Sequence, residues 1–243
     1  MPKSGTKSTR TMGDWVSLAL GVVTSGMVLL ALTMVFFYAP PEKVMGIVYK
    51  IFYFHVPSAI VMGVFFFLCA IASLGYLMSE DSRLDAFAVT CAELAILFGL
   101  IVLISGPLWA RKAWGTWWTW EPRLAITLIT VFIYIAYLAV RGYGTDASMG
   151  RRMAAGIGML GAPAYYFIKI AVEKWGGNHP KNVVYGKSEG LEDAVIANTF
   201  FVSLAAVALL AIWIFWVRFT LHRMRDKVEG LRVEMDEMDL LDR

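Results

Sequence analysis

The chain has 243 residues, of which 58% are hydrophobic and 17% are charged. With a mean hydropathy of +0.62, this composition excludes a water-soluble domain, a disordered chain and a disulfide-rich scaffold, and it indicates a protein that resides in a bilayer. The net charge of +3 is far smaller than that of a basic nucleic-acid-binding surface, so we expect no nucleic-acid partner.

Six uncharged stretches are long enough to cross a membrane, which takes about 20 mainly apolar residues. We predict an all-α membrane protein with six transmembrane helices. These helices are expected over residues 15–38, 52–78, 86–107, 123–141, 153–173 and 196–219. The first stretch is too long for the apolar core of a signal peptide, so we interpret it as an uncleaved span. Residues 1–220 are therefore expected to form one membrane domain.

Both termini are expected on the same side of the membrane, because the number of spans is even. Lysine and arginine favour the cytoplasmic side. More of the 22 lysines and arginines fall in the termini and the even-numbered connections than in the odd-numbered ones. This bias places both termini in the cytoplasm.

The three odd-numbered connections are longer than the even ones and carry distinctive residues. They cover residues 39–54, 108–122 and 174–195, whereas the even connections are short turns near 79–85 and 142–152. Binding residues concentrate on loops that a rigid scaffold holds. We therefore expect the functional site on the odd side, together with one or more short amphipathic helices.

The second of these connections is rich in tryptophan, since five of the nine tryptophans lie between Trp109 and Trp120. If this segment is a short interfacial helix, Trp114, Trp117 and Trp118 lie on one face and form a flat aromatic shelf. The alternative is an aromatic belt, because indole side chains favour the membrane interface. A belt distributes its tryptophans over many helix ends, which this sequence does not do.

Two of the three histidines, His55 and His179, are also predicted on the odd side. Two imidazoles on opposite sides of a planar macrocycle give six-coordinate haem. Arg123 is positioned to bind a propionate of such a ring, and Lys50, Arg111 and Lys112 are less specific candidates. The alternative for each of these residues is an ordinary side chain at a membrane interface.

The run Trp114-Gly115-Thr116-Trp117-Trp118-Thr119-Trp120-Glu121-Pro122-Arg123-Leu124 resembles the motif W-G-x-x-W-x-W-D of haem-handling membrane proteins. Six spans, a histidine before the second and another between the fifth and sixth resemble in particular the CcmC family of bacterial cytochrome c maturation. The resemblance covers essentially residues 15–220. One difference is Glu121, where the family has aspartate.

This resemblance implies a haem carrier of the bacterial inner membrane, and not an enzyme. It implies that His55 and His179 are axial ligands of a non-covalent, b-type haem at the periplasmic face. The implied haem-contacting residues are Trp114, Gly115, Trp117, Trp118, Trp120, Glu121 and Arg123. The implied partners are a membrane-anchored haem chaperone (CcmE type), an ABC ATPase with its membrane subunit (CcmA and CcmB type), a small single-span subunit (CcmD type) and membrane lipid.

Three further features are expected to have structural or docking roles. Glycines 156, 158 and 161 match G-x-G-x-x-G inside an apolar span with no preceding strand, which favours close helix packing over dinucleotide binding. Glu93 is expected to be a neutral or snorkelling structural acid near the cytoplasmic end of the third span. Residues 221–243 form a charged segment, and its apolar residues repeat at steps of three and four. We predict a cytoplasmic helix that docks on a partner.

Three other functions remain alternatives. A b-type electron-transfer subunit would also hold haem between two histidines, although such histidines normally project from within spans. An ABC-type permease would carry the tryptophans only as an interfacial belt. An enzyme that attaches haem directly to apocytochrome would need a larger odd-side region.

Overall fold

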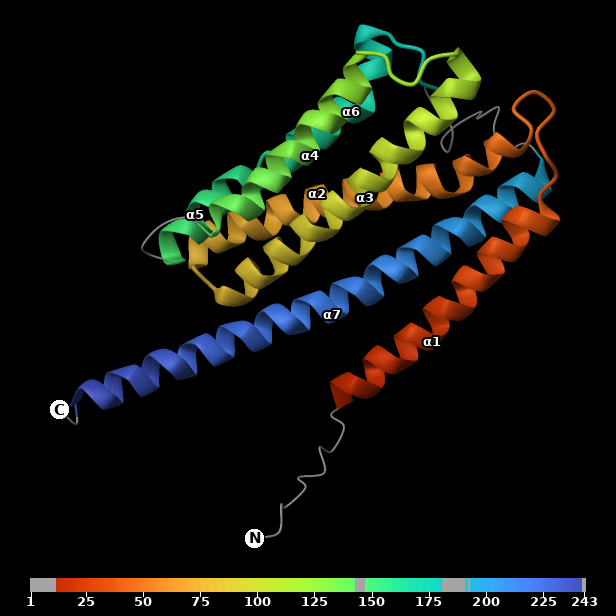
Figure 1. Ribbon diagram of the computed structural model, residues 1–243. Coiled ribbons are helices and arrows are strands. Elements are labelled where there is room, and N and C mark those ends of the chain that lie inside the picture. The colour runs from red at the N-terminus through yellow and green to blue at the C-terminus, as the bar shows by residue number, and fades with distance from the viewer. Residues whose placement is uncertain (1–11, 143–146, 181–190, 192, 242–243) are drawn as a thin grey trace.

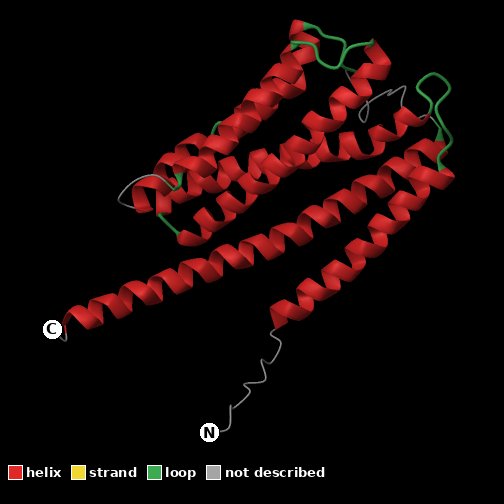
Figure 2. Cartoon of the chain, in the orientation of Figure 1, coloured by secondary structure: helices red, strands yellow, loops and turns green. Residues whose placement is uncertain are grey.

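The structure is a computed structural model that describes residues 12–142, 147–180, 191 and 193–241. Over these residues the regular elements are all helices (Figures 1 and 2). They are α1 (Met12–Thr33), η1 (Met34–Tyr38), η2 (Ile47–Ile51), α2 (Phe52–Ser79), α3 (Ser82–Trp114), α4 (Pro122–Val140), α5 (Ala147–Gly158), α6 (Gly161–Trp175) and α7 (Ala194–Leu241). The predicted cytoplasmic N-terminal segment, with Lys3, Lys7 and Arg10, lies outside the described residues.

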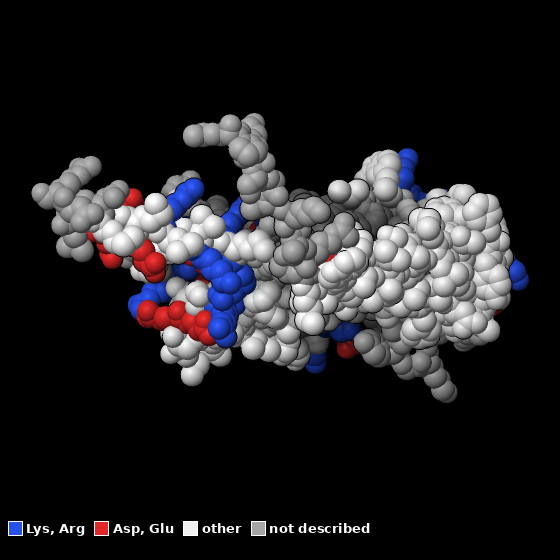
Figure 3. All heavy atoms as spheres, turned by 90° about the horizontal axis from the view of Figure 1, so that it is seen from below, with Lys and Arg blue, Asp and Glu red and all other residues white. Residues whose placement is uncertain are grey.

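Six helical segments of the described chain are long and apolar enough to span a membrane, which confirms the predicted fold class. They are Met12–Tyr38, Ile47–Ser79, Ser82–Trp114, Pro122–Val140, Ser148–Trp175 and Ala194–Met238. Helices α2 to α6 form a bundle, and α1 packs along α7 on one side of it (Figure 1). The surface over α1 and α7 is largely free of charge, whereas charged side chains gather around the far end of α7 (Figure 3).

The fifth span differs from the prediction, because it is two helices rather than one. Helix α5 ends at Gly158 and α6 begins at Gly161. The hydroxyl of Tyr134 lies 3.0 Å from the carbonyl oxygen of Gly158 and compensates for the helical hydrogen bond lost there. The short link lets α5 and α6 both pack closely on α2 and α4.

The glycines at this break confirm part of the packing interpretation. A Cβ atom at Gly161 would overlap the Tyr134 hydroxyl and lie 2.8 Å from the carbonyl oxygen of Phe66. A Cβ at Gly158 would meet the Ser73 hydroxyl. Gly156 differs, because no atom lies within 4 Å of its Cβ position. Gly158 and Gly161 therefore make the close contacts, and Gly156 does not.

We expect Gly161→Ala to destabilise the protein by about 1–3 kcal/mol, because the added methyl group overpacks a buried contact. Gly156→Ala is the matched control and is expected to leave stability unchanged or slightly raised. Thermal unfolding of the two purified variants in detergent measures the difference. Equal unfolding temperatures would show that the helix break is not tightly packed.

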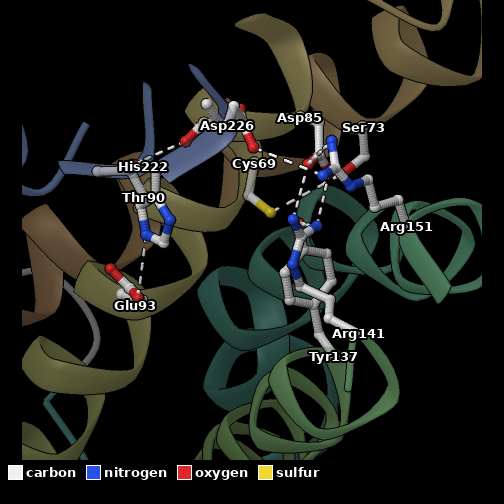
Figure 4. A network of polar contacts seen from close by, with 11 residues as sticks. Cys69, Ser73, Asp85, Thr90, Glu93, Tyr137, Arg141, Arg151, His222 and Asp226 are labelled. Carbon is white, nitrogen blue, oxygen red and sulfur yellow. Dashed lines mark hydrogen bonds and ion pairs between the residues drawn. The ribbon is translucent and has the colours of Figure 1, made fainter. Parts of the chain in front are cut away.

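Charged residues form a network at the end of the bundle where α3 begins (Figure 4). The Asp85 carboxylate binds Arg141 through two hydrogen bonds of 2.6 Å, and Arg151 lies 3.7 Å away. The carboxylate of Glu93 accepts hydrogen bonds from Arg218 and lies 3.2 Å from His222 Nε2. Glu93 is thus a structural acid, as expected, but it is ion-paired with α7 rather than neutral or snorkelling.

Helix α7 continues without interruption beyond residue 219, where the predicted sixth span ends, through the charged segment that the sequence sets apart after residue 220. Arg218 and His222 fix its base to α3 through Glu93. Beyond this anchor, apolar side chains of the helix are exposed. Those that follow one another at steps of three and four are Leu221, Met224, Val228, Leu231, Met235 and Met238, and Val233 is exposed as well.

Candidate functional site

A cavity of about 870 Å³ lies at the end of the bundle opposite the charged network. Its walls come from α2, α3, α4 and α6, and its depth reaches Met62 and Thr127 inside the bundle. Most of the wall residues are apolar or aromatic. Pockets for small molecules and cofactors have volumes of roughly 300–1,000 Å³, so the cavity has the size and character of a binding site for a large apolar ligand.

Five of the predicted site residues line this cavity. They are His55, Trp114, Trp118, Arg123 and His179. The cavity also has wall residues that sequence reasoning missed, among them Trp109, Tyr49 and Tyr165. Trp109 lies in the tryptophan-rich segment, so the sequence could have identified it as a site residue. Tyr49 and Tyr165 are ordinary aromatic residues of helical segments, and nothing in the sequence distinguishes them.

The tryptophan-rich segment is not a helix after Trp114, so the condition for Trp114, Trp117 and Trp118 to share one helical face is not met. Helix α3 ends at Trp114 because Gly115 adopts a left-handed conformation, with φ +74°. The chain then runs without helix to Pro122, which starts α4. We call residues 115–121 the tryptophan loop.

The tryptophan loop divides its rings between the cavity and the surface. Trp118 lines the cavity, whereas Trp117 and Trp120 are 56% and 77% exposed. Trp118 packs edge-on against Trp120, with ring centroids 5.8 Å apart. Arg111 lies 5.9 Å from the centroid of the Trp117 ring and donates to the Gly115 carbonyl. Two exposed indoles are therefore close in the chain to Trp118, which lines the cavity.

Two of the less specific candidates for propionate binding bond to backbone carbonyls instead. Arg111 donates to the carbonyl of Gly115 in the tryptophan loop. Lys50 is buried and donates to the carbonyl oxygen of Phe36 over 3.1 Å. Of the cations named from the sequence, Arg123 is the one that lines the cavity.

His55 lies in the first turn of α2 and contacts α3. Its Nδ1 atom is 2.9 Å from the Ser105 hydroxyl oxygen, and this hydroxyl donates to the Ile101 carbonyl over 2.6 Å. A Cβ atom at Gly106 would lie 3.3 Å from His55 Cε1. The ring therefore packs against the backbone of α3 while it faces the cavity. Ser105 was missed because a serine inside a span gives no sequence signal.

His179 lies in the connection after α6, which two glycines direct away from the helix. Gly176 and Gly177 have φ of +80° and +135°, which favour glycine strongly. Arg123 Nη1 lies 2.8 Å from His179 Nδ1 and 3.0 Å from the Pro180 carbonyl oxygen. Arg123 also donates to the carbonyls of Ile168 and Lys169, so it ties this connection to α6.

Burial and, to a smaller extent, the nearby Arg123 guanidinium lower the pKa of His179 to about 4. The imidazole is therefore neutral at pH 7. A neutral imidazole is the form that ligates metals.

Glu121 connects the tryptophan loop to the histidine connection. Its Oε2 atom accepts a hydrogen bond of 2.6 Å from the backbone N–H of Asn178, next to His179. A side chain at Gly177 would collide with this carboxylate, since a Cβ there would lie 2.7 Å from Oε2. The other oxygen, Oε1, is buried without a hydrogen-bond partner among the described residues, as is Trp118 Nε1. Glu121 does not line the cavity but positions the segment that does.

A family model described as "CcmC: Heme exporter protein C" matches residues 3–239. Heme exporter protein C of Bradyrhizobium diazoefficiens is 30% identical over 201 residues, which cover 82% of this chain and 74% of the relative. A putative cytochrome c biosynthesis ccmC-like mitochondrial protein of Marchantia polymorpha is 32% identical over 58% of this chain and 59% of its own length. Heme exporter protein C of Escherichia coli is 30% identical, and the match spans 59% of each chain.

Proposed function

The chain belongs to the CcmC family of heme exporter proteins, and on this premise we propose that it is a haem carrier for c-type cytochrome biogenesis. In this proposal it binds haem at the periplasmic face of the bacterial inner membrane and delivers it to a membrane-anchored haem chaperone. The observation that carries the proposal is that His55 and His179, far apart in the sequence, line one apolar cavity.

The residues around this cavity suit the chemistry of haem. The two imidazoles supply axial nitrogen ligands, and the aromatic wall with Trp114 and Trp118 suits a flat apolar ring. Arg123 supplies a cation for a propionate once it releases its present partners. We propose the rest of the tryptophan loop, with Gly115, Trp117, Trp120 and Glu121, as the support and outer edge of this haem shelf.

The haem in this proposal is of the b type and not covalently attached. Cys69 and Cys91 are buried in the apolar core of the bundle and do not line the cavity. Their position supports the proposal that the haem is held without a thioether bond.

A carrier must bind haem tightly and still release it. Two axial bonds and a large apolar contact make capture tight, while a site beside exposed loops leaves an edge for transfer. A ligand or partner shifts such an equilibrium only through different affinities for two states. We propose that an ABC ATPase with its membrane subunit (CcmA and CcmB type) supplies this difference, and that a small single-span subunit (CcmD type) joins the complex.

The C-terminal part of α7 has a separate role in this proposal. Residues 221–243 form a charged cytoplasmic extension of the membrane domain, residues 1–220. The exposed apolar side chains from Leu221 to Met238 follow the spacing of a coiled-coil seam. We propose that a partner subunit covers this face.

Glu121→Ala is expected to weaken haem binding about tenfold. The change leaves the N–H of Asn178 without its acceptor, which costs about 1–3 kcal/mol and loosens the connection that holds His179. A titration of the purified variant with haemin, followed by absorbance, measures the loss. Glu121→Gln keeps an acceptor oxygen and is expected to bind more tightly than Glu121→Ala. Equal binding of Glu121→Ala and the wild type would contradict the positioning role.

The proposed function is tested in a bacterium from which the CcmC-family gene has been deleted. Expression of this chain is expected to restore covalent haem on the haem chaperone, measured by haem staining after denaturing electrophoresis, and c-type cytochromes downstream. If the chaperone carries the same amount of haem with and without the chain, delivery is not its function.

A further inference from the structure

The Ser105 hydroxyl determines which nitrogen of His55 carries the proton. A hydroxyl has one hydrogen, and that of Ser105 is donated to the Ile101 carbonyl over 2.6 Å. Toward His55 Nδ1, 2.9 Å away, the hydroxyl oxygen can then only accept. This arrangement favours the neutral tautomer with its proton on Nδ1 and a lone pair on Nε2.

The ring of His55 is also fixed in place. It packs on the backbone of α3 at Gly106, where an added Cβ would stand 3.3 Å from His55 Cε1. Since the ring lines the cavity, its lone pair is available to a ligand there. His55 is thus in the tautomer and position that iron ligation through Nε2 requires, before any iron arrives.

His179 is in the opposite state. Nδ1 of His179 has two contacts, because Arg123 Nη1 lies 2.8 Å away and the Pro180 carbonyl oxygen 3.1 Å away. A guanidinium has only N–H donors, so the shorter contact favours Nδ1 as an acceptor. With Nδ1 as the acceptor, the proton of this neutral ring is on Nε2, where it blocks ligation. For Nε2 to bind iron, the proton must move to Nδ1 and Arg123 must leave. The Pro180 carbonyl, 3.1 Å from Nδ1, is the acceptor at hand for the new N–H.

We propose that Ser105 is a positioning residue that presets His55 as the first and longest-held ligand of the haem iron, and that His179 is the exchangeable ligand. The inference rests on the proposed haem-binding function and adds the order in which the two histidines bind and release the iron. His179 binds only when Arg123 lets go, and the return of Arg123 to His179 Nδ1 favours release. His55 therefore keeps the haem bound while His179 dissociates from the iron for transfer.

The tautomers can be measured without haem, so a failure of the proposed function leaves this test intact. The chain has three histidines, and ¹⁵N labelling of their rings gives signals assignable with His→Ala variants. We expect the wild-type spectrum to show His55 protonated on Nδ1 and His179 protonated on Nε2. In Ser105→Ala the preference of His55 for Nδ1 should be lost, and in Ser105→Thr it should be kept. The same tautomer for both histidines would overturn the proposal.

Haem binding tests the consequence through a double-mutant cycle. Loss of an outer-shell hydrogen bond typically lowers metal affinity by about 10–100-fold, so Ser105→Ala should weaken haemin binding at least tenfold. The same loss is expected in the His179→Ala background, and none in the His55→Ala background. Ser25→Ala, which removes a similar hydroxyl-to-carbonyl bond of 2.8 Å on α1, should have no effect.

Two results of this cycle would contradict the proposal. A loss caused by Ser105→Ala that persists in the His55→Ala background would show that Ser105 acts on the fold rather than on His55. Equal loss of haem in His55→Ala and His179→Ala would show that the two ligands are equivalent. If the wild type binds no haemin while the tautomers are as expected, the proposed function fails and the hydrogen-bond assignment stands.

Discussion

The protein with His55→Ala and His179→Ala together is expected to contain no haem above background after purification. Loss of a hydrogen bond to a metal ligand alone costs about 10–100-fold in affinity, so removal of both ligands should cost more than about a hundredfold. The cavity walls remain and can still attract the apolar ring, but without axial bonds. The visible absorption spectrum should therefore lose its sharp six-coordinate bands.

The third histidine provides the matched control for this prediction. His222 lies at the opposite end of the bundle, beside Glu93, and is remote from the cavity lining. His222→Ala should leave the spectrum unchanged. If the double variant keeps the wild-type haem bands, the ligand assignment is wrong. The alternative that the tryptophans form an aromatic belt at the membrane interface is then favoured.

Asp85→Ala is expected to destabilise the fold by about 3–5 kcal/mol, the cost of removing one partner of a buried ion pair. Asp85 is 2% exposed, and its carboxylate is the bidentate partner of Arg141. Without it, the Arg141 guanidinium stays in a half-buried position with no countercharge within 4 Å among the described residues. Thermal unfolding in detergent should show a large decrease in the unfolding temperature.

An exposed ion pair serves as the control, because it has the same charges as the Asp85–Arg141 pair but is not buried. Arg152 and Glu80 are bonded on the surface, with side chains 56% and 59% exposed. Exposed pairs contribute about 0–1 kcal/mol, so Arg152→Ala should hardly change the unfolding temperature. Similar decreases for Asp85→Ala and Arg152→Ala would show that the network does not stabilise the bundle through buried pairing.

Hydropathy predicted the number and places of the spans, but not the break in the fifth. Apolar residues continue on both sides of Met159 and Leu160. The hydropathy averaged over about 20 residues therefore does not reveal that the helix stops there. Pro163, near the start of α6, was the available signal, because proline favours the first turn of a helix. The contacts of Gly161 with α2 and α4 are tertiary, and no local pattern contains them.

Residue chemistry identified the candidate site better than local structure did. Imidazole and indole in odd-numbered connections predicted residues that line the cavity, such as His179 and Trp118. The conformation of the tryptophan loop was missed because helical spacing was assumed across Gly115, which ends α3. Ser105 was missed because a hydroxyl bonded to the preceding turn is common in spans, and its contact with His55 joins two helices.

The most direct test of the haem-carrier function is the transfer of haem between purified proteins. The chain is purified with the proposed ATPase and membrane partner subunits and loaded with haem. It is then mixed with the proposed haem chaperone and ATP, and the absorption spectrum is followed. The carrier function predicts that haem leaves this chain and becomes covalently bound to the chaperone. Haem that stays on this chain while its iron is rapidly reduced and reoxidised would contradict the carrier function and indicate a b-type electron-transfer subunit.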